Sequence, residues 1–358
     1  MTRSLPVLLF LLIALPAAGQ STAPESKAPQ TPAPAAAAPQ PDFPIVRIGM
    51  TSFLQYAAEF ENRDGYNAFD VTRTYLNINA QVSPRFRFRF TPDIRRVNDG
   101  SLSGSLVVRV KYAFVQFDNP TPRAWIRFGA HQTPWLDFEE SINRYRVQGT
   151  MFSERELLIP GSSDFGASYF TPLPNGFGEV QGGVFNGEGF GLPEANKYKS
   201  VQGRLTVRPL PNRGAWNGLR LSGFYNAGWY AADRPRRLGI VMGSFEHRYV
   251  VATVQHLEAT ENPSPTAPTD IDRSGSSAFL EVREDVAGWA GLLRVDRFDP
   301  NTSTANNSDR RIIAGGAYWF VWPRARLGLV VTNEQVHYEA AAGRPNEDRL
   351  LVQTHIEF

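Results

Sequence analysis

The sequence predicts an all-β fold: a transmembrane antiparallel β-barrel of about sixteen strands, with a long third external loop folded into the lumen. Alternating apolar and polar residues recur along most of the chain, which is the pattern of strands with one apolar and one polar face. No apolar run reaches the roughly eighteen residues that a membrane helix needs. If the chain enters a membrane, it therefore does so as strands.

The last residues of the chain, 350–358 (LLVQTHIEF), show this alternation clearly. One face would carry Leu350, Val352, Thr354, Ile356 and Phe358, and the other would carry Leu351, Gln353, His355 and Glu357. We expect the first set to face lipid and the second to face the lumen. A terminal aromatic residue such as Phe358 is also typical of the signal that bacterial barrel proteins present to their assembly machinery, which is an expected partner during biogenesis.

The amino-terminal residues predict export followed by a linker. Arg3 precedes an apolar run from Val7 to Leu15 and the small residues Ala17 and Ala18, so residues 1–19 are predicted to be a signal peptide. Residues 20–43 are rich in Ala and Pro and are predicted to be a periplasmic linker. No second linker follows, so residues 44–358 are predicted to form one outer-membrane barrel.

The strands are predicted in order from the alternation and from the turn residues between them. Short connections carry Pro or Asn, as at Ser83-Pro84 and Trp322-Pro323, whereas the connections on the other side are longer and polar, as expected for periplasmic turns and external loops. An even number of strands places both termini in the periplasm. The predicted strands lie near residues 45–60, 70–82, 85–95, 106–117, 123–131, 164–171, 177–186, 200–209, 218–228, 237–247, 249–259, 276–284, 288–298, 310–321, 324–337 and 348–358.

The third predicted strand indicates what lines the lumen. Its arginines alternate with Phe86, Phe88 and Phe90, and three arginines cannot face lipid. Like charges on one sheet face need water, counter-charges or a ligand, and a water-filled pore supplies all three. The basic residues predicted to line the pore are Arg73, Arg85, Arg87, Arg89, Arg109, Lys111, Arg127, Arg204 and Arg208.

The longest connection, residues 132–163, follows the fifth strand. It contains Trp135, Phe138 and Phe152 among other apolar residues, so we expect it to fold into the lumen and narrow it. Its carboxylates are expected to form an acidic edge opposite the basic wall and to set a transverse field. The predicted constriction residues are Asp137, Glu139, Glu140, Arg144, Arg146, Glu154 and Arg155.

Motifs around this loop resemble the phosphate-selective porin O and P family. They are Phe128-Gly129-Ala130-His131-Gln132-Thr133-Pro134, Glu139-Glu140, Met151-Phe152-Ser153-Glu154-Arg155 and Asp164-Phe165-Gly166. The resemblance implies a sixteen-stranded porin that assembles as a homotrimer. The chain departs from the family pattern in two ways: Ser163 stands where the family commonly has Arg, and no Lys lies between Lys111 and Lys197.

Other functional classes find little support. The five histidines are scattered and no HExxH motif occurs, so neither a metal nor a cofactor is expected, and the chain is not expected to be an enzyme. Absence of cysteine excludes a lipoprotein anchor and a Cys-based zinc site, and a net charge of +2 gives no indication of nucleic-acid binding. The sequence also disfavours a rim lipase or protease, a two-domain soluble sandwich and a plugged active transporter.

The function that follows is passive diffusion of small hydrophilic solutes through the bacterial outer membrane. Lipid of that membrane and small anionic or polar solutes are the expected partners, and the arginines favour anions such as phosphate. A general non-selective diffusion porin is the main alternative. A non-conducting structural or adhesin barrel is a further one, which predicts a plugged lumen.

Overall fold

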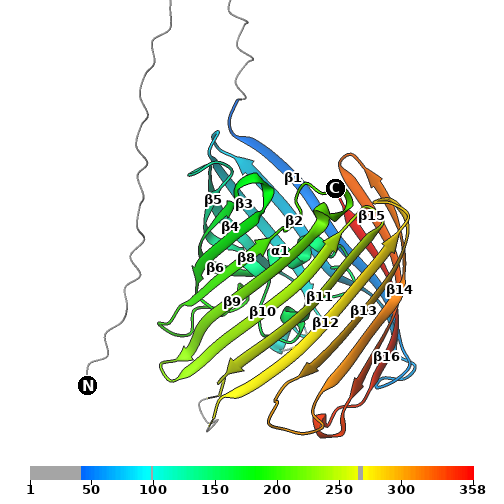
Figure 1. Ribbon diagram of the computed structural model, residues 1–358. Helices are drawn as coiled ribbons and strands as arrows, with labels where there is room; N and C mark the ends of the chain where they lie inside the picture. Colours follow the sequence, from blue (N-terminus) through cyan, green and yellow to red (C-terminus); the bar gives the residue numbers. More distant parts are fainter. Residues whose placement is uncertain (1–41, 98–99, 265–268) are drawn as a thin grey trace, which may run out of the picture. The chain divides into compact units, whose positions relative to one another are not determined.

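The computed structural model describes residues 42–97, 100–264 and 269–358, and the predicted signal peptide and the predicted linker up to residue 41 lie outside them. The described chain forms sixteen antiparallel strands in a closed barrel (Figure 1), so the predicted fold class is confirmed. Each strand pairs with its sequence neighbours, and β1 pairs with β16 from Thr51 opposite Glu357 to Glu59 opposite Arg349. Closure leaves no free sheet edge around the ring.

The strands are found close to where the alternation predicts them, and two short α-helices lie in the connection that was predicted as a long loop. The largest shift is in β12, which begins at Ile271 rather than near residue 276. The strands are β1 (Ile45–Glu59), β2 (Asn67–Gln81), β3 (Phe86–Arg96), β4 (Leu106–Asp118), β5 (Trp125–Gln132), β6 (Ser163–Pro172), β7 (Gly178–Phe185), β8 (Ser200–Val207), β9 (Leu219–Ala231), β10 (Arg234–Glu246), β11 (Val250–Glu261), β12 (Ile271–Arg283), β13 (Gly288–Asp299), β14 (Asp309–Trp322), β15 (Ala325–Tyr338) and β16 (Glu347–Glu357), and the helices are α1 (Pro134–Ile142) and α2 (Phe152–Arg155).

The side chains of the last strand, β16, alternate between the inside and the outside of the barrel as predicted. Leu351, Gln353 and His355 point inward and are at most 3% exposed, whereas Val352 points outward and is 43% exposed. Phe358 is exposed at the end of the chain, and its backbone N–H donates to the carbonyl of Met50 at 3.1 Å. The inward polar and outward apolar sets are those of a barrel that separates lipid from a polar interior.

Aromatic side chains gather on the outer surface near the strand ends that hold the short turns. Trp289 packs on Tyr318 with ring centroids 4.9 Å apart, and Phe320 stacks on Trp322 at 5.9 Å. Such amphipathic rings suit the boundary between hydrocarbon and headgroups. Trp319 is different, because it points inward and is 1% exposed.

A β-bulge interrupts the alternation in β4. Thr91 of β3 pairs with Tyr112 and Pro92 pairs with Val110, which leaves Lys111 as an extra residue. Pro92 has no N–H to give to the ladder, which fits its place at the irregularity. Because of the bulge, Lys111 and Tyr112 are both buried inside the barrel although they are adjacent in sequence.

Candidate functional site

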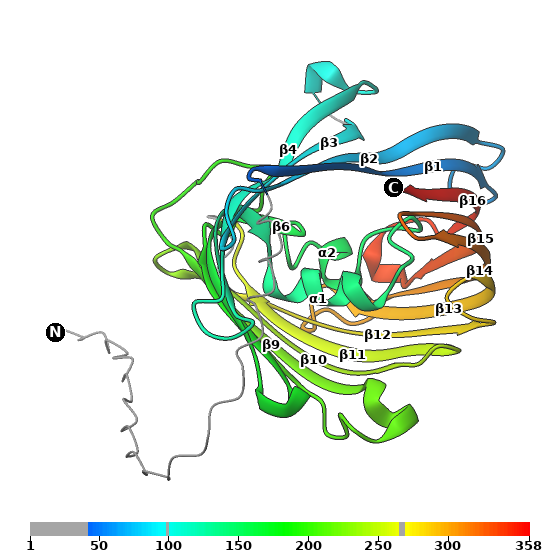
Figure 2. The same ribbon diagram turned by 90° about the horizontal axis from the view of Figure 1, so that it is seen from above.

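Residues 133–162, which join β5 to β6, lie inside the barrel and contain α1 and α2 (Figure 2). We call them the lumen segment. Their apolar side chains pack on the inner wall, and the ring centroids of Trp135 and Phe224 of β9 lie 5.7 Å apart. Farther along the segment, the ring centroids of Tyr145 and Phe279 of β12 lie 6.0 Å apart. The segment thus covers one side of the interior, and the hydrophobic effect holds it there.

Polar contacts tie the lumen segment to the same side. Arg144 donates to the Glu281 carboxylate at 2.8 Å and to the carbonyl of Val286 in the β12–β13 turn at 2.7 Å. Arg155 pairs with Asp296 of β13 at 2.6 Å. Both carboxylates are almost fully buried, so these ion pairs are shielded from water.

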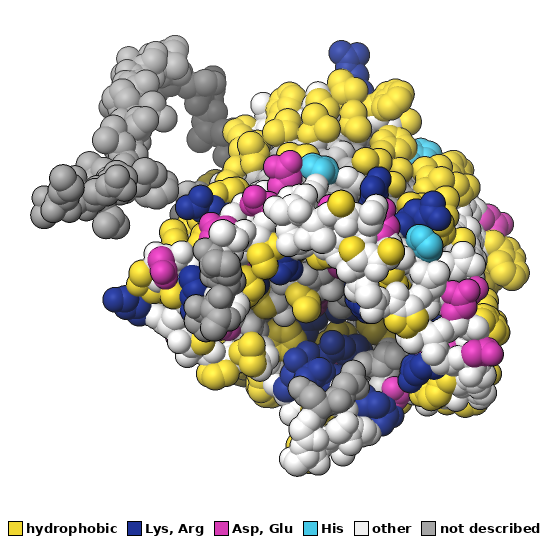
Figure 3. All heavy atoms as spheres, turned by 90° about the horizontal axis from the view of Figure 1, so that it is seen from below, with side chains coloured by type: hydrophobic (Ala, Val, Ile, Leu, Met, Phe, Trp, Pro, Cys, Tyr) yellow, Lys and Arg dark blue, Asp and Glu magenta, His cyan; other side chains and the backbone are white. Residues whose placement is uncertain are grey.

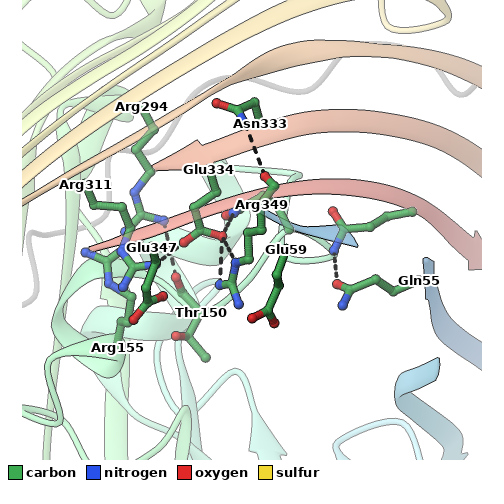
Figure 4. Close-up of polar contacts among 12 residues, drawn as sticks. Gln55, Glu59, Thr150, Arg155, Arg294, Arg311, Asn333, Glu334, Glu347 and Arg349 are labelled. Carbon is green, nitrogen blue, oxygen red and sulfur yellow. Dashed lines mark hydrogen bonds and ion pairs between the residues drawn. The ribbon is translucent and has the colours of Figure 1, made fainter. Parts of the chain in front are cut away.

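A third anchor is centred on Glu334 of β15 (Figure 4). This carboxylate is 2% exposed by residue, and it pairs with Arg311 of β14 and, at 2.8 Å, with Arg349 of β16. The side-chain amide of Gln148 in the lumen segment donates to it at 3.2 Å. Glu334 therefore joins two neighbouring strands and the segment through one buried charge.

The inner face of β1–β5 carries cationic side chains. Arg73 and Arg109 both pair with the buried Asp93, at 2.8 and 2.9 Å. The Lys111 ammonium lies 4.5 Å from the ring centroid of Tyr75, a cation–π distance. We call the following set the basic wall: Arg47, Arg73, Arg87, Arg89, Arg109, Lys111 and Arg127. Seen from the external end, Lys and Arg side chains gather inside the hollow of the barrel (Figure 3).

Two cavities adjoin the basic wall. The first, of about 190 Å³, lies between the wall and the lumen segment, whose Glu140, Arg144 and Arg146 line it. The second, of about 340 Å³, lies at the ends of β1–β5 that carry the short turns, and it is lined by arginines of the basic wall and by the amides of Asn79, Gln81 and Gln116. Arg89 lines both cavities, so it lies between them.

Comparison with known proteins gives a fold and no close relative. No family model and no curated protein matches the chain. Among solved structures, an anion-selective porin from Comamonas acidovorans superposes with a TM-score of 0.61 at 13% identity, covering 87% of this chain and 99% of the porin. A loop L8 deletion mutant of OmpT, an outer membrane protein of Vibrio cholerae, matches with a TM-score of 0.61 at 11% identity, covering 88% of this chain and 100% of OmpT. A trimer form of OmpT matches with a TM-score of 0.57 at 11% identity, with the same coverage.

The chain has the fold of bacterial porins. Sequence identities of 11–13% support a shared fold but not a shared function.

Most of the predicted basic residues meet in the lumen of this porin-fold barrel, and three do not. Arg85 is exposed in the turn before β3, and Arg208 follows the end of β8. Arg204 is 4% exposed beneath the lumen segment, where it pairs with Glu179 at 2.8 Å and donates to the carbonyl of Pro134 at 2.9 Å. It braces α1 and does not contact the open cavities described above.

The lumen segment does not present the expected acidic edge. Glu140 pairs with Arg146 at 3.0 Å, and Arg146 also pairs with Glu154 at 3.4 Å. The Asp137 carboxylate forms an ion pair with the guanidinium of Arg127 in the basic wall, with N and O atoms 3.4 Å apart. Because arginines of the segment line the first cavity beside Glu140, the electrostatic contrast between the two sides is weaker than the sequence suggests.

Arg47 is a wall residue that the sequence argument missed. It lies in β1 between Val46 and Ile48, which point outward and are 53% and 69% exposed. The same alternation that located the arginines of β3 would have located Arg47 too, since its neighbours are apolar on both sides.

In the part of the chain that the structure describes, no helix is long and apolar enough to cross a membrane. Nor do the described residues bring three or more His, Cys, Asp or Glu side chains together in a group that could hold a metal ion.

The buried Glu139 of α1 predicts a pH-dependent stability. It accepts hydrogen bonds from the indole of Trp135 at 3.0 Å and the amide of Gln255 at 2.6 Å, yet burial raises the pKa of its carboxyl from the ordinary 4.5 to about 7. The unfolded carboxyl ionises near its ordinary pKa, so the folded state binds more protons between these two values. Stability should fall by roughly 3 kcal/mol as the pH rises from about 4.5 to 7.

The measurement is urea unfolding in detergent micelles at several pH values. Glu139→Gln keeps one side-chain oxygen, which can accept one of the two hydrogen bonds, and it removes the titration, so its stability should lack this step. A step of equal size in the variant would contradict the assignment to Glu139.

Proposed function

We propose that this protein is a porin of the bacterial outer membrane through which small hydrophilic solutes diffuse passively, with anions favoured over cations. The observation that carries the proposal is the basic wall. It runs along β1–β5 from Arg73 and Arg109 at the external side to Arg47 and Arg127 at the periplasmic side, beside two polar cavities. Asp93 and Asp118 offset only part of this charge.

The mechanism is diffusion through water with weak, repeated pairing. The wall's guanidinium groups lower the electrostatic barrier for an entering anion and can replace part of its hydration shell. Contacts must be several and individually weak, because one tight site would hold the solute and block exit. The lumen segment narrows the interior and so sets an upper size for solutes.

The same proposal includes location and assembly. The outward apolar face and the aromatic residues at its margin suit outer-membrane lipid, and the exposed Phe358 is available to the assembly machinery. A homotrimer is proposed because a trimer form occurs among the structures that share the fold. Phosphate is proposed among the favoured anions on the resemblance of the loop motifs to the phosphate-selective porin O and P family.

The test is the reversal potential in a planar bilayer under a potassium chloride gradient, with phosphate added in a second series. The purified protein should conduct and should favour chloride over potassium. Absence of current would support a structural or adhesin barrel, and a reversal potential near zero would support a general diffusion porin.

Arg89→Glu should lower the ratio of chloride to potassium permeability by about threefold or more, because Arg89 lines both cavities and reversing its charge changes the field where they meet. Arg213→Glu makes the same change of charge at an exposed residue in the β8–β9 connection and should leave the ratio unaltered. Equal shifts in the two variants would show that net charge, rather than the basic wall, sets selectivity.

A further inference from the structure

The second cavity has a regular pattern of arginines and amides that the strand register imposes. In one row across the sheet, Arg47 of β1 lies opposite Asn79 of β2, and Asn79 lies opposite Arg89 of β3. In the next row, Arg87 of β3 lies opposite Gln116 of β4, which lies opposite Arg127 of β5. Each row therefore places one amide between two arginines, which keeps like charges from being direct neighbours.

The two rows differ in how their charge is balanced. Arg87 pairs with Asp118 at 2.5 Å, and Arg127 pairs with Asp137 at 3.4 Å. Within residues 42–97, 100–264 and 269–358, neither Arg47 nor Arg89 has a carboxylate at ion-pair distance. The cavity thus holds two guanidinium groups that form no ion pair with a carboxylate of the described residues.

These two groups are held apart. Neighbouring strands lie about 4.8 Å apart, so Arg47 and Arg89, with one strand between them, have Cα atoms about 10 Å apart. Arg89 is further restrained by hydrogen bonds from its guanidinium to Asn77 at 2.8 Å and to Thr91 at 3.1 Å, both on the side away from Arg47's end of β1. A solute with two separated anionic groups can pair with both side chains without drawing Arg89 away from Asn77 and Thr91.

The space between the charges suits a short carbon chain. The cavity measures about 340 Å³, and its lining includes Ile45, Ala80 and Phe114 beside the polar groups. At about 30 Å³ per water molecule, it has room for on the order of ten waters, much more than one small inorganic ion displaces. Asn79 and Gln116 add amide groups that can hydrogen-bond carboxylate oxygens or their water shell.

We propose that this cavity is a transient binding site for small organic dianions of the dicarboxylate class. One carboxylate would pair with Arg47, the other with Arg89, and the carbon chain between them would lie over Asn79, which stands between the two arginines. The proposal rests on the proposed porin function and deepens it, because it names the class of solute that the periplasmic half of the lumen selects. It predicts that charge spacing, and not charge alone, determines retention.

The experiment measures potassium chloride conductance of the full-length protein in planar bilayers while succinate, acetate or phosphate is added at constant ionic strength. Succinate should reduce conductance saturably, with a half-saturating concentration about tenfold below that of acetate, since a second charge-assisted contact is worth a factor of this order. Phosphate should half-saturate at a higher concentration than succinate. Equal values for succinate and acetate, or tighter binding of phosphate, would overturn the proposal.

Variants of the two arginines test whether succinate acts at the second cavity. Arg47→Gln and Arg89→Gln should each raise the half-saturating succinate concentration about tenfold and leave that of acetate within about threefold. Arg89→Lys keeps the charge and should retain most of the succinate effect, and Arg213→Gln, an exposed turn residue, should retain all of it. If neither glutamine variant weakens succinate, the cavity is not the site. If the channel favours chloride but does not separate succinate from acetate, only this proposal fails, whereas a cation-selective channel would refute the porin proposal beneath it.

Discussion

Trp135→Ala should destabilise the protein by about 3–5 kcal/mol, because it removes a large side chain that is 0% exposed between the lumen segment and the barrel wall. The indole contacts Phe224 of β9 and Phe138 of α1, with ring centroids 5.7 and 6.1 Å apart. Its N–H also donates to Glu139 at 3.0 Å, and that contact is lost. The folded fraction against urea, followed by electrophoretic mobility without heating, measures the change.

The same variant should alter conduction, since the freed segment can move within the lumen. We expect larger current fluctuations at constant voltage than in the parent protein. Trp216→Ala removes an equally large but 59% exposed side chain in the β8–β9 connection and serves as the control. Trp135→Ala with the stability and current noise of this control would show that packing against β9 does not hold the segment.

Glu334→Ala should cost about 3 kcal/mol, because it leaves two partly buried arginines without their shared, buried counter-charge. Arg311 and Arg349 reach Glu334 from the neighbouring strands (Figure 4). The side-chain amide of Gln148 reaches it from the lumen segment. The loss therefore weakens two strand pairings and one anchor together. Urea unfolding in micelles gives the free energy of unfolding.

Glu258→Ala is the matched control, since the Glu258 side chain points away from the lumen and is 80% exposed. It should change the free energy of unfolding by less than about 0.5 kcal/mol. The loss of stability in Glu334→Gln should lie between those of Glu258→Ala and Glu334→Ala. Its amide oxygen still accepts a hydrogen bond from one guanidinium but carries no charge. If Glu334→Ala were no worse than Glu258→Ala, the buried ion pairs would contribute nothing to stability.

The strands could be predicted because each carries its own signal. In β16 and β3 the apolar and polar residues alternate with period two, and only one register keeps the arginines out of lipid. The number of strands follows from the count of such segments, and closure follows from the penalty on a free edge in lipid.

The bulge at Lys111 could not be predicted in the same way. Val107, Arg109 and Lys111 share a face in an ideal strand, and so would Ala113 and Val115. In the structure Tyr112, Phe114 and Gln116 take the inward positions instead, because the extra residue reverses the facing of every position after it. The signal that existed was Pro92 in the partner strand, which cannot donate to the ladder.

The contacts between the lumen segment and the barrel wall could not be predicted from the sequence either. Arg144 and Glu281 are 137 positions apart, and Gln148 and Glu334 are 186 apart. Nothing in the local pattern of either residue encodes such a pairing. Arg204 illustrates the consequence: its strand position is that of a pore-lining residue, but α1 covers it.

The sequence by itself determined that this chain forms an even, closed barrel with arginines on one inner wall, because alternation and the exclusion of charge from lipid are local constraints. Only the tertiary structure decided which of those arginines keep their charge free, because that depends on carboxylates brought in by other strands and by the lumen segment. Arg87 and Arg127 meet Asp118 and Asp137, whereas Arg89 contacts the neutral Asn77 and Thr91. Selectivity is proposed to follow from that difference.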